Sequence, residues 1–238
     1  DFFRNIPDYV NFPYRGNESK IPSITVHSFL LTLKYSEKYS DEIDNTLWAW
    51  ANFGGVGMRT RRGAGAIYIE ECAPKNIAEI NEKLKKIIKE DIIHRPWSLL
   101  STRFTYGQAN NFADRAWFDA LSPLKEFRQG RVGRRYEGRD PKRSYWPEAD
   151  SIRRITGNSS PKHKNSTTGN HNAFPRAELG LPLIIKFKDE YSGEPSPVEI
   201  APSEGERWPS PLILKPIALQ GGKGFMPILM IIRRYIYN

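Results

Sequence analysis

The sequence predicts an α+β fold in which helices cover a mostly antiparallel sheet. Three observations carry this prediction: strand-like and helix-like segments alternate over residues 24–91, a long basic segment without clear periodicity follows later, and three strand-like segments come after it. This order is typical of helices packed on an antiparallel sheet. A ferredoxin-like arrangement, the one found in RNA-recognition domains, fits it best.

Five segments have the composition of strands, because β-branched and aromatic residues are enriched in them. The first two alternate with helices, and the last three follow the basic segment. They are ITVHSFLLTLKY (24–35), AGAIYIEEC (64–72), LPLIIKF (181–187), SPLILKPIAL (210–219) and the C-terminal run MPILMII (226–232).

Two helices are predicted with clear ends. In SDEIDNTLWAWANF (40–53), acidic residues crowd the first turn, Ser40 is the expected N-cap, and Gly54 should end the helix. In NIAEINEKLKKIIKED (76–91), Asn76 and Glu79 have the spacing of a capping box, and an apolar stripe recurs at helical intervals.

A third helix is predicted over roughly residues 112–127. Its apolar residues recur less regularly, and Pro123 is expected to kink or split it. The residues expected to face inward are Phe112, Ala116, Phe118 and Leu121.

The net charge favours an anionic partner, and the cysteine content and the apolar runs exclude several classes of protein. The 238 residues include 36 Lys and Arg against 27 Asp and Glu, which gives a net charge of +9. The single cysteine, Cys72, excludes a disulfide within the chain and a cysteine-based zinc site. No apolar run approaches the ~18 residues of a membrane span. We therefore expect a cytoplasmic protein without membrane contact.

Composition predicts three regions along the chain. Residues 1–127 form a first region that contains most of the core, 128–175 a basic and partly mobile insertion, and 176–238 the strands that complete the domain. Within the insertion, residues 128–154 hold nine Lys and Arg against four acidic residues. The polar stretch TGNSSPKHKNSTTGNHN (156–172) is typical of a mobile loop.

The segment 54–65 joins five glycines to three arginines and admits three interpretations. A nucleotide-phosphate loop is disfavoured, because neither G-x-x-x-x-G-K-[ST] nor G-x-G-x-x-G is present and the helix precedes the loop. A purely structural turn explains one or two glycines. A backbone cradle for RNA explains the combination, because glycines allow close approach of a sugar–phosphate strand and arginines pair with phosphates.

Four segments in the same order, spanning about residues 20–220, resemble the RAMP superfamily of CRISPR effector subunits. The first is the glycine-rich signature LWAWANFGGVGMRTRRGAGAI. The others, SYWPEADSIRR (144–154), AFPRAELGLPLIIKF (173–187) and RWPSPLILKPIAL (207–219), are similar to the branch that caps the guide-RNA 3′-end side of the type III-B Cmr complex. Members carry a first RAMP half ahead of this point, which we expect in a longer form of this chain or on another polypeptide.

The resemblance implies a ferredoxin-like RAMP fold and non-catalytic binding of guide RNA, with target RNA as a further possible ligand. It also implies contact with other RAMP subunits of an antiviral ribonucleoprotein, and no cofactor. The glycine-rich motif carries over to Gly54, Gly55, Gly57, Arg59, Arg61, Arg62, Gly63 and Gly65. The tryptophan-containing motif carries over to Trp146, Pro147, Arg153 and Arg154. Positive charge adds Arg143 to the candidate RNA-binding residues, and it is also the reason to expect an RNA contact of Arg153 and Arg154.

Catalysis and metal binding are not expected. The histidines are His27 within a predicted strand, His94 at a helix end, and His163 and His171 in the polar loop, where preorganisation for acid–base chemistry is poor. No H-x-x-x-H motif or carboxylate cluster suggests a metal site. Two alternatives stay open, a guide-RNA-processing RAMP endoribonuclease and a scaffold that contacts only proteins.

Overall fold

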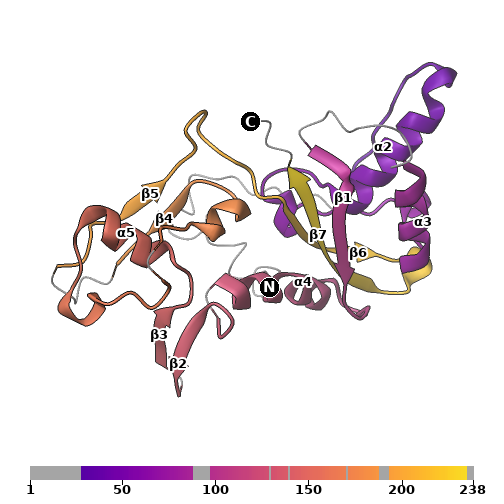
Figure 1. Cartoon of the computed structure of the whole chain (residues 1–238). Helices are drawn as coiled ribbons and strands as arrows, with labels where there is room; N and C mark the ends of the chain where they lie inside the picture. The colour runs from indigo at the N-terminus through magenta and orange to yellow at the C-terminus, as the bar shows by residue number, and fades with distance from the viewer. Residues whose placement is uncertain are drawn as a thin grey trace, which may run out of the picture. The chain divides into compact units, whose positions relative to one another are not determined.

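The computed structural model describes residues 28–87, 97–128, 130–138, 140–169, 171–187 and 193–234. The chain divides into two compact units, unit 1 (1–121 with 213–238) and unit 2 (122–212). Helices and antiparallel strands occur together (Figure 1), so the predicted α+β class is confirmed. The ferredoxin-like topology and the region limits at 127 and 175 stay predictions.

Unit 1 contains a three-stranded sheet with the order β1-β7-β6. Its strands are β1 (Trp97–Tyr106), β7 (Phe225–Arg234) and β6 (Leu212–Ala218). β1 runs antiparallel to β7, with Phe104 opposite Met230 and Tyr106 opposite Ile228. Between β6 and β7, the short helix η8 (Gln220–Gly222) makes the turn, and the Leu219 N–H donates to Gly224 O at 2.9 Å. The strands predicted over 210–219 and 226–232 are thus confirmed.

Helices α2 (Ser40–Phe53) and α3 (Ile77–Ile87) contribute the other side of the core of unit 1. Trp48 and Phe53 of α2, with Ile80 and Leu84 of α3, pack with buried residues of the sheet. Those sheet residues and the turn leucine are Ile213, Ile217, Leu219, Met226, Ile228 and Met230.

The start of α3 and the end of α2 follow the local signals of the sequence. At the start of α3, the Glu79 N–H donates to Asn76 Oδ1 at 3.1 Å, as the capping-box spacing predicted. The Glu79 carboxylate accepts from the Lys75 N–H at 2.7 Å. Gly54 ends α2 as predicted, whereas Tyr39, which ends the short helix η3 (Glu37–Tyr39), takes the N-cap position expected for Ser40.

Helix α4 (Ala113–Arg128) contributes residues to both units and continues through Pro123, so the helix is not split at that residue, and a kink there stays a prediction. Ala116 and Leu121 are buried as predicted. Phe112 and Phe118 are exposed, so their predicted inward orientation is wrong. They lie outside the buried stripe, which contains Ala116, Ala120, Leu121 and Leu124 instead.

Over its described residues, unit 2 contains the last residues of α4, two short antiparallel strand pairs and one further α-helix. β2 (Arg134–Glu137) pairs with β3 (Asp140–Ser144), and β4 (Leu183–Ile185) pairs with β5 (Val198–Ile200). Helix α5 (Glu148–Thr156) places Ile152 against Leu181, Leu183 and Ile185. Two short helices, η6 (Pro161–His163) and η7 (Pro175–Leu179), complete it.

Two predicted strands are wrong over the described residues. Residues 28–35 of the first have no regular secondary structure, and Phe29, Leu30, Leu31 and Leu33 are exposed. The segment 64–72 forms an irregular stretch and the short helix η5 (Glu70–Cys72). Composition favours an extended backbone, but a strand also needs a hydrogen-bonded neighbour. No neighbour is found for either segment within the described part of the chain.

Lys215 is the largest fully buried side chain among the described residues, at 1% relative exposure. From β6 its ammonium donates to the carbonyls of Ala51 at 3.3 Å and of Gly54 at 2.8 Å. The last carbonyls of a helix have no partner within the helix and carry partial negative charge, so a cation there is stabilising. Burial lowers the pKa of Lys215 to about 8.

The shifted pKa predicts a specific pH dependence of stability. Between about pH 8 and pH 10.5, the unfolded chain retains a proton on Lys215 that the folded chain has lost. The free energy of unfolding should therefore gain up to about 1.4 kcal/mol per pH unit from this residue across that window. Urea unfolding of wild type and Lys215→Met measures it: their difference should grow with pH in favour of wild type. Lys223→Met, an exposed control that keeps Lys215, should follow wild type, and a pH-independent difference would contradict the assignment.

Candidate nucleic-acid interface

The glycine–arginine segment forms one closed loop, here the Gly/Arg loop, residues 54–65. The Val56 N–H donates to Gly65 O at 2.9 Å and closes it. Within it, the short helix η4 (Thr60–Arg62) lies between two residues with left-handed backbone, Arg59 at φ 58° and Gly63 at φ 84°. The structure thus gathers all eight predicted site residues of this segment into one compact element.

Most glycines of the Gly/Arg loop are required by its internal packing. A Cβ on Gly55 would lie 2.7 Å from Gly65 O, and a Cβ on Gly65 would overlap the Val56 carbonyl. At Gly63 the added atom would collide with the Trp117 indole. Gly57 differs, because its φ of +88° favours glycine while the space around its Cβ position is open. Gly57 is therefore the glycine at which backbone conformation can be tested without an internal clash.

Three side chains hold the loop to the rest of unit 1. The Trp50 indole N–H donates to Gly55 O at 3.3 Å, and the Trp117 indole N–H donates to Arg62 O at 2.6 Å. The Lys215 ammonium binds Gly54 O at the point where the loop begins. These contacts fix the path of the loop backbone from α2, α4 and β6.

Arg59, Arg61 and Arg62 lie within four residues of the loop and are each half-buried. None of the three is without an interaction in the folded chain, and the Arg62 guanidinium donates to Arg61 O at 3.2 Å. A guanidinium stays protonated whatever its partners, so each arginine keeps its positive charge while it contacts the protein. The loop can therefore present three permanent positive charges on a fixed backbone.

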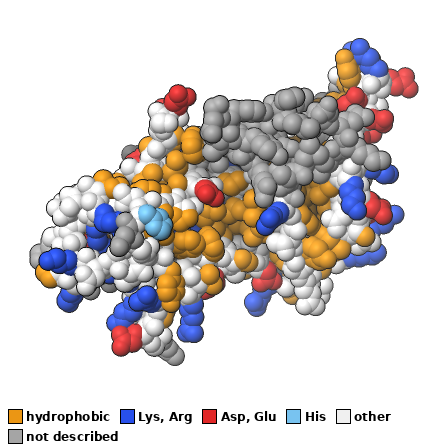
Figure 2. Space-filling model, in the orientation of Figure 1, with side chains coloured by type: hydrophobic (Ala, Val, Ile, Leu, Met, Phe, Trp, Pro, Cys, Tyr) orange, Lys and Arg blue, Asp and Glu red, His pale blue; other side chains and the backbone are white. Residues whose placement is uncertain are grey.

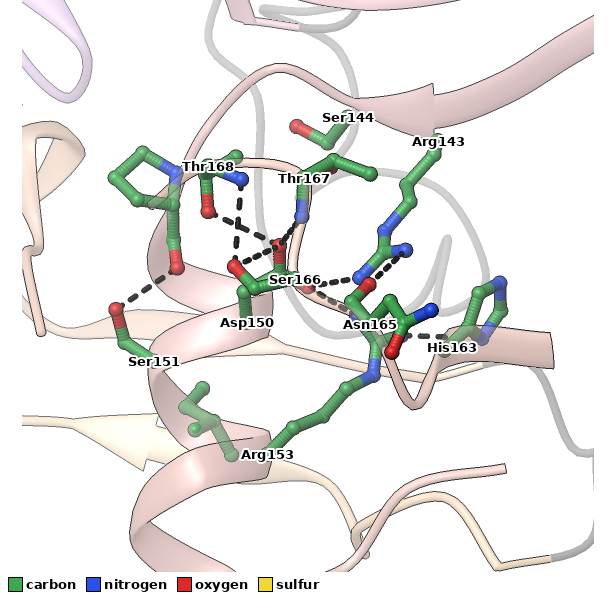
Figure 3. Close-up of polar contacts among 12 residues, drawn as sticks. Arg143, Ser144, Asp150, Ser151, Arg153, His163, Asn165, Ser166, Thr167 and Thr168 are labelled. Carbon is green, nitrogen blue, oxygen red and sulfur yellow. Dashed lines mark hydrogen bonds and ion pairs between the residues drawn. The ribbon is translucent and has the colours of Figure 1, made fainter. Parts of the chain in front are cut away.

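Two of the predicted site residues of unit 2, Arg143 and Arg153, bind a different centre, the buried carboxylate of Asp150 (Figure 3). Its Oδ1 accepts from Arg143, and from Arg153 at 2.9 Å. Its Oδ2 accepts from Ser166 Oγ at 3.2 Å, the Thr167 N–H at 3.0 Å and Thr168 Oγ1 at 3.0 Å. Residues 166–168 of the predicted mobile loop are thus tied to α5.

The surroundings of Asp150 strongly favour its charged form. Burial by itself raises the pKa of this carboxyl, but hydrogen bonds from Arg143, the Thr167 backbone and Thr168, with the charge of Arg143, outweigh burial. The pKa of Asp150 is therefore held well below its usual range.

Arg153 connects Asp150 to a second carboxylate, Glu194. The Arg153 Nε donates to Glu194 Oε2 at 2.8 Å, and Glu194 Oε1 lies 2.5 Å from His163 Nδ1. Burial raises the pKa of Glu194, but the hydrogen bonds from Arg153, His163 and Ser160 and the charge of Arg153 lower it to about 2. His163, predicted to lie in a mobile loop, is held in place by this contact.

Arg154 uses its whole guanidinium within unit 2. Each of its five N–H groups has a protein acceptor, at distances from 2.6 to 3.3 Å. The acceptors are Asn172 Oδ1, Ser166 Oγ, Gly169 O, Ser151 Oγ and His171 O. An RNA contact of Arg154 stays a prediction, and in this conformation it can act only through its charge.

Trp146 packs on the protein as well. Its ring lies 4.5 Å from the Phe127 ring between centroids, and its indole N–H donates to Phe127 O at 2.9 Å. The neighbouring Tyr145 is 51% exposed, with the Arg135 guanidinium 5.6 Å from its ring centroid. Tyr145 is therefore better exposed for base stacking than Trp146, whose RNA contact stays a prediction.

Sequence reasoning missed the two groups that organise these sites, Asp150 and Lys215. The Asp150–Arg153 pair has the i,i+3 spacing of neighbours on a helix and was detectable once α5 was recognised. The role of Lys215 carried no local signal, because its acceptors lie more than 160 residues earlier in the chain.

The charged side chains visible in Figure 2 lie in separate groups on the face drawn, with hydrophobic side chains between them. Among the described residues, no group of three His, Cys, Asp or Glu side chains could hold a metal ion. Over the same residues, no helix has the length and apolar character needed to cross a membrane. His27 and His94, weighed as catalytic candidates, lie outside the described residues.

The network around Asp150 predicts a large loss of stability when its charge is removed. Asp150→Asn leaves Arg143 and Arg153 without their shared carboxylate and should destabilise unit 2 by about 3 kcal/mol or more. Hydrogen exchange of α5 and β4 amides reports this local stability directly. The control Glu137→Gln breaks the exposed pair with Lys142 in the same unit and should leave the exchange nearly unchanged.

The same network sets the response to acid. Because the pKa values of Asp150 and Glu194 are lowered in the folded state, their contribution is complete at neutral pH and is lost as the pH falls from about 4.5 toward 2. Over that interval, the free energy of local unfolding obtained from amide exchange should depend less on pH in Asp150→Asn than in wild type. Equal acid sensitivity of variant and wild type would contradict this account.

Comparison with known proteins yields one match. Residues 5–68 match the family model of the RAMP superfamily, and the Gly/Arg loop lies inside the matched segment. No curated protein and no solved structure matches the chain. The match supports a RAMP CRISPR-associated protein.

Proposed function

We propose that this chain is a non-catalytic RNA-binding subunit of a type III-B CRISPR ribonucleoprotein that acts in antiviral defence in the cytoplasm. It holds guide RNA near the 3′ end, paired target RNA, or both, and contacts neighbouring RAMP subunits. The observation that carries the proposal is the position of the Gly/Arg loop within the segment that matches the RAMP superfamily. That match suggests a CRISPR-associated subunit that interacts with RNA.

The loop geometry supports phosphate binding rather than base reading. Three arginines lie within four residues on a backbone fixed by Trp50, Trp117 and Lys215. Guanidinium groups bind phosphate oxygens through charge-assisted hydrogen bonds, and such contacts carry no base information. Guide bases would stay available for pairing with target RNA, as the proposed role requires.

The packing of the glycines modifies the cradle hypothesis. Gly55, Gly63 and Gly65 are explained by the closure of the loop on itself and on Trp117. Gly57, with the exposed Val56 and Met58 beside it, is where close approach of an RNA backbone remains sterically possible. We therefore propose that the three arginines supply the positive charge and that the RNA backbone approaches the loop closely at Gly57.

Removing the arginine charges should weaken RNA binding without unfolding the protein. Arg59→Ala/Arg61→Ala/Arg62→Ala should bind single-stranded RNA of any sequence more weakly, because phosphate contacts are lost. The plot of log affinity against log salt should become shallower by about 0.7 per lost contact. Fluorescence anisotropy at several salt concentrations measures both quantities, and circular dichroism checks folding. A folded variant with wild-type affinity would exclude the loop as the RNA site and favour the protein-only scaffold.

The backbone contribution is tested separately at Gly57. Gly57→Val should weaken RNA binding with the charge unchanged, because it adds bulk at an open site and disfavours the φ of +88°. Gly222→Val is the matched control in the same unit, since Gly222 has φ +68° and equally open surroundings. If both variants bind RNA equally well, close approach at Gly57 is not part of the mechanism.

One observation favours the endoribonuclease alternative. His163 is oriented by the Glu194 carboxylate at 2.5 Å, the arrangement in which a carboxylate fixes an imidazole for acid–base chemistry. For the non-catalytic proposal, we expect labelled guide-type RNA to stay intact on incubation with the chain, with or without divalent metal. Gel electrophoresis of the RNA measures this. Specific cleavage that His163→Gln abolishes while binding persists would replace the proposed function with the nuclease.

A further inference from the structure

Unit 2 contains a hollow of about 200 Å³ beside the C-terminal end of α5. Arg153, Arg154, His163, Lys164, Ser159 and Asp150 contribute to its lining. It is smaller than the ~300–1,000 Å³ of pockets that enclose whole drug-sized molecules. A small group is therefore the ligand that its size favours.

The charge around the hollow is positive. Its lining contains three permanent cations, Arg153, Arg154 and Lys164, and one carboxylate, Asp150. The contacts behind this lining add Arg143 and Glu194, so four cations face two carboxylates, an excess of two positive charges. The C-terminus of α5 contributes only about half a negative charge. The hollow therefore favours an anion.

Asp150 does not oppose such an anion strongly. Both of its oxygens are occupied: Oδ1 by two guanidinium groups, and Oδ2 by a backbone N–H and two hydroxyls. Its charge is compensated within the network, and its lone pairs point to protein donors.

The hydrogen-bond donors of the hollow that have no protein acceptor are of the kinds that bind oxyanions. Arg153 uses two of its N–H groups on Glu194 and Asp150, and because His163 Nδ1 donates to Glu194, its 3.4 Å contact with Arg153 occupies no further donor, which leaves three N–H groups on the same guanidinium. Lys164 is exposed, and among the described residues its ammonium has no hydrogen-bond or ion-pair partner. Within the same part of the chain, the Ser159 hydroxyl is half-buried and makes no hydrogen bond to protein. A guanidinium, an ammonium and a hydroxyl together match a tetrahedral oxyanion with several acceptor oxygens.

We infer that this hollow binds a phosphate group, with Lys164, Ser159 and the free N–H groups of Arg153 as donors and with Arg154 adding charge. The ligand class is a phosphate oxyanion, either free phosphate or the terminal phosphate of an RNA. The small volume of the hollow favours a terminal group over the middle of a strand. The inference is independent of the RNA-holding role of the Gly/Arg loop, which belongs to the other unit.

The test is titration calorimetry of the full chain with inorganic phosphate, with sodium chloride added to keep ionic strength constant. Wild type should bind saturably, and Lys164→Ala should weaken binding about tenfold or more, as expected when a charged hydrogen bond is lost. Lys162→Ala is the matched control, because it removes the same charge two residues away, at a position that does not line the hollow, and should bind like wild type. The triple arginine variant of the Gly/Arg loop should also keep phosphate binding, which separates this inference from the proposed function.

Ser159→Ala provides a second variant that leaves the charge unchanged, and it should also weaken phosphate binding. Comparing RNA that carries a 5′-phosphate with the same RNA carrying a 5′-hydroxyl distinguishes the sources. Tighter binding of the phosphorylated RNA, lost in Lys164→Ala, identifies an RNA 5′ end as the ligand, whereas equal binding excludes it. Absence of saturable binding up to about 10 mM phosphate, or equal loss in Lys162→Ala and Lys164→Ala, would overturn the inference.

Discussion

The buried ammonium of Lys215 is the interaction on which the arrangement of unit 1 depends. It lies on β6 within the apolar core and donates to the last carbonyls of α2, those of Ala51 and Gly54. The contact therefore joins the sheet, the end of the helix and the first residue of the Gly/Arg loop at a single point. Desolvation of the cation opposes this arrangement, as the lowered pKa of Lys215 records. The otherwise unpaired helix carbonyls offset that cost.

Unit 2 is organised around buried polar groups rather than around a large apolar core. Helix α5 contributes one buried apolar side chain, Ile152, whereas Glu148, Asp150 and Ser151 on the same helix are all buried. Each of these three has partners: Arg176 for Glu148, two arginines and the 166–168 segment for Asp150, and the backbone of Ala173 for Ser151. A buried polar network of this kind stabilises the fold only while every member is paired. Its residues are consequently constrained by folding before any ligand is considered.

This constraint divides the basic residues into two groups. The arginines of the Gly/Arg loop lie on a backbone that the rest of unit 1 fixes, and they add charge without carrying the apolar core. Arg143, Arg153 and Arg154 compensate carboxylates or bind backbone carbonyls, so most of their donors serve the structure of unit 2. A high content of Lys and Arg in residues 128–154 is therefore not in itself a nucleic-acid surface. This segment can bind a ligand only through the N–H donors that have no acceptor within the buried polar network.

The sequence by itself determined α2 and α3, the last strands of unit 1 and the gathering of the glycines and arginines into one loop. Helix periodicity and caps are local signals: the Asn76–Glu79 spacing and Gly54 mark ends that the structure reproduces. The α+β class followed from the same signals. Strands depend on distant partners, so composition alone placed strands wrongly at 28–35 and 64–72 and missed β1, β2, β3 and β5.

Only the tertiary structure decided which polar groups are buried and what each pairs with. Helix α5 escaped recognition because its buried face is polar, and hydrophobic periodicity cannot detect such a face. Lys215 and its carbonyl acceptors, like Arg153 and Glu194, are far apart in the sequence and meet only in the folded chain. The number of arginines is a property of the sequence. The number of their N–H donors left for a ligand is a property of the fold, because each internal acceptor removes one.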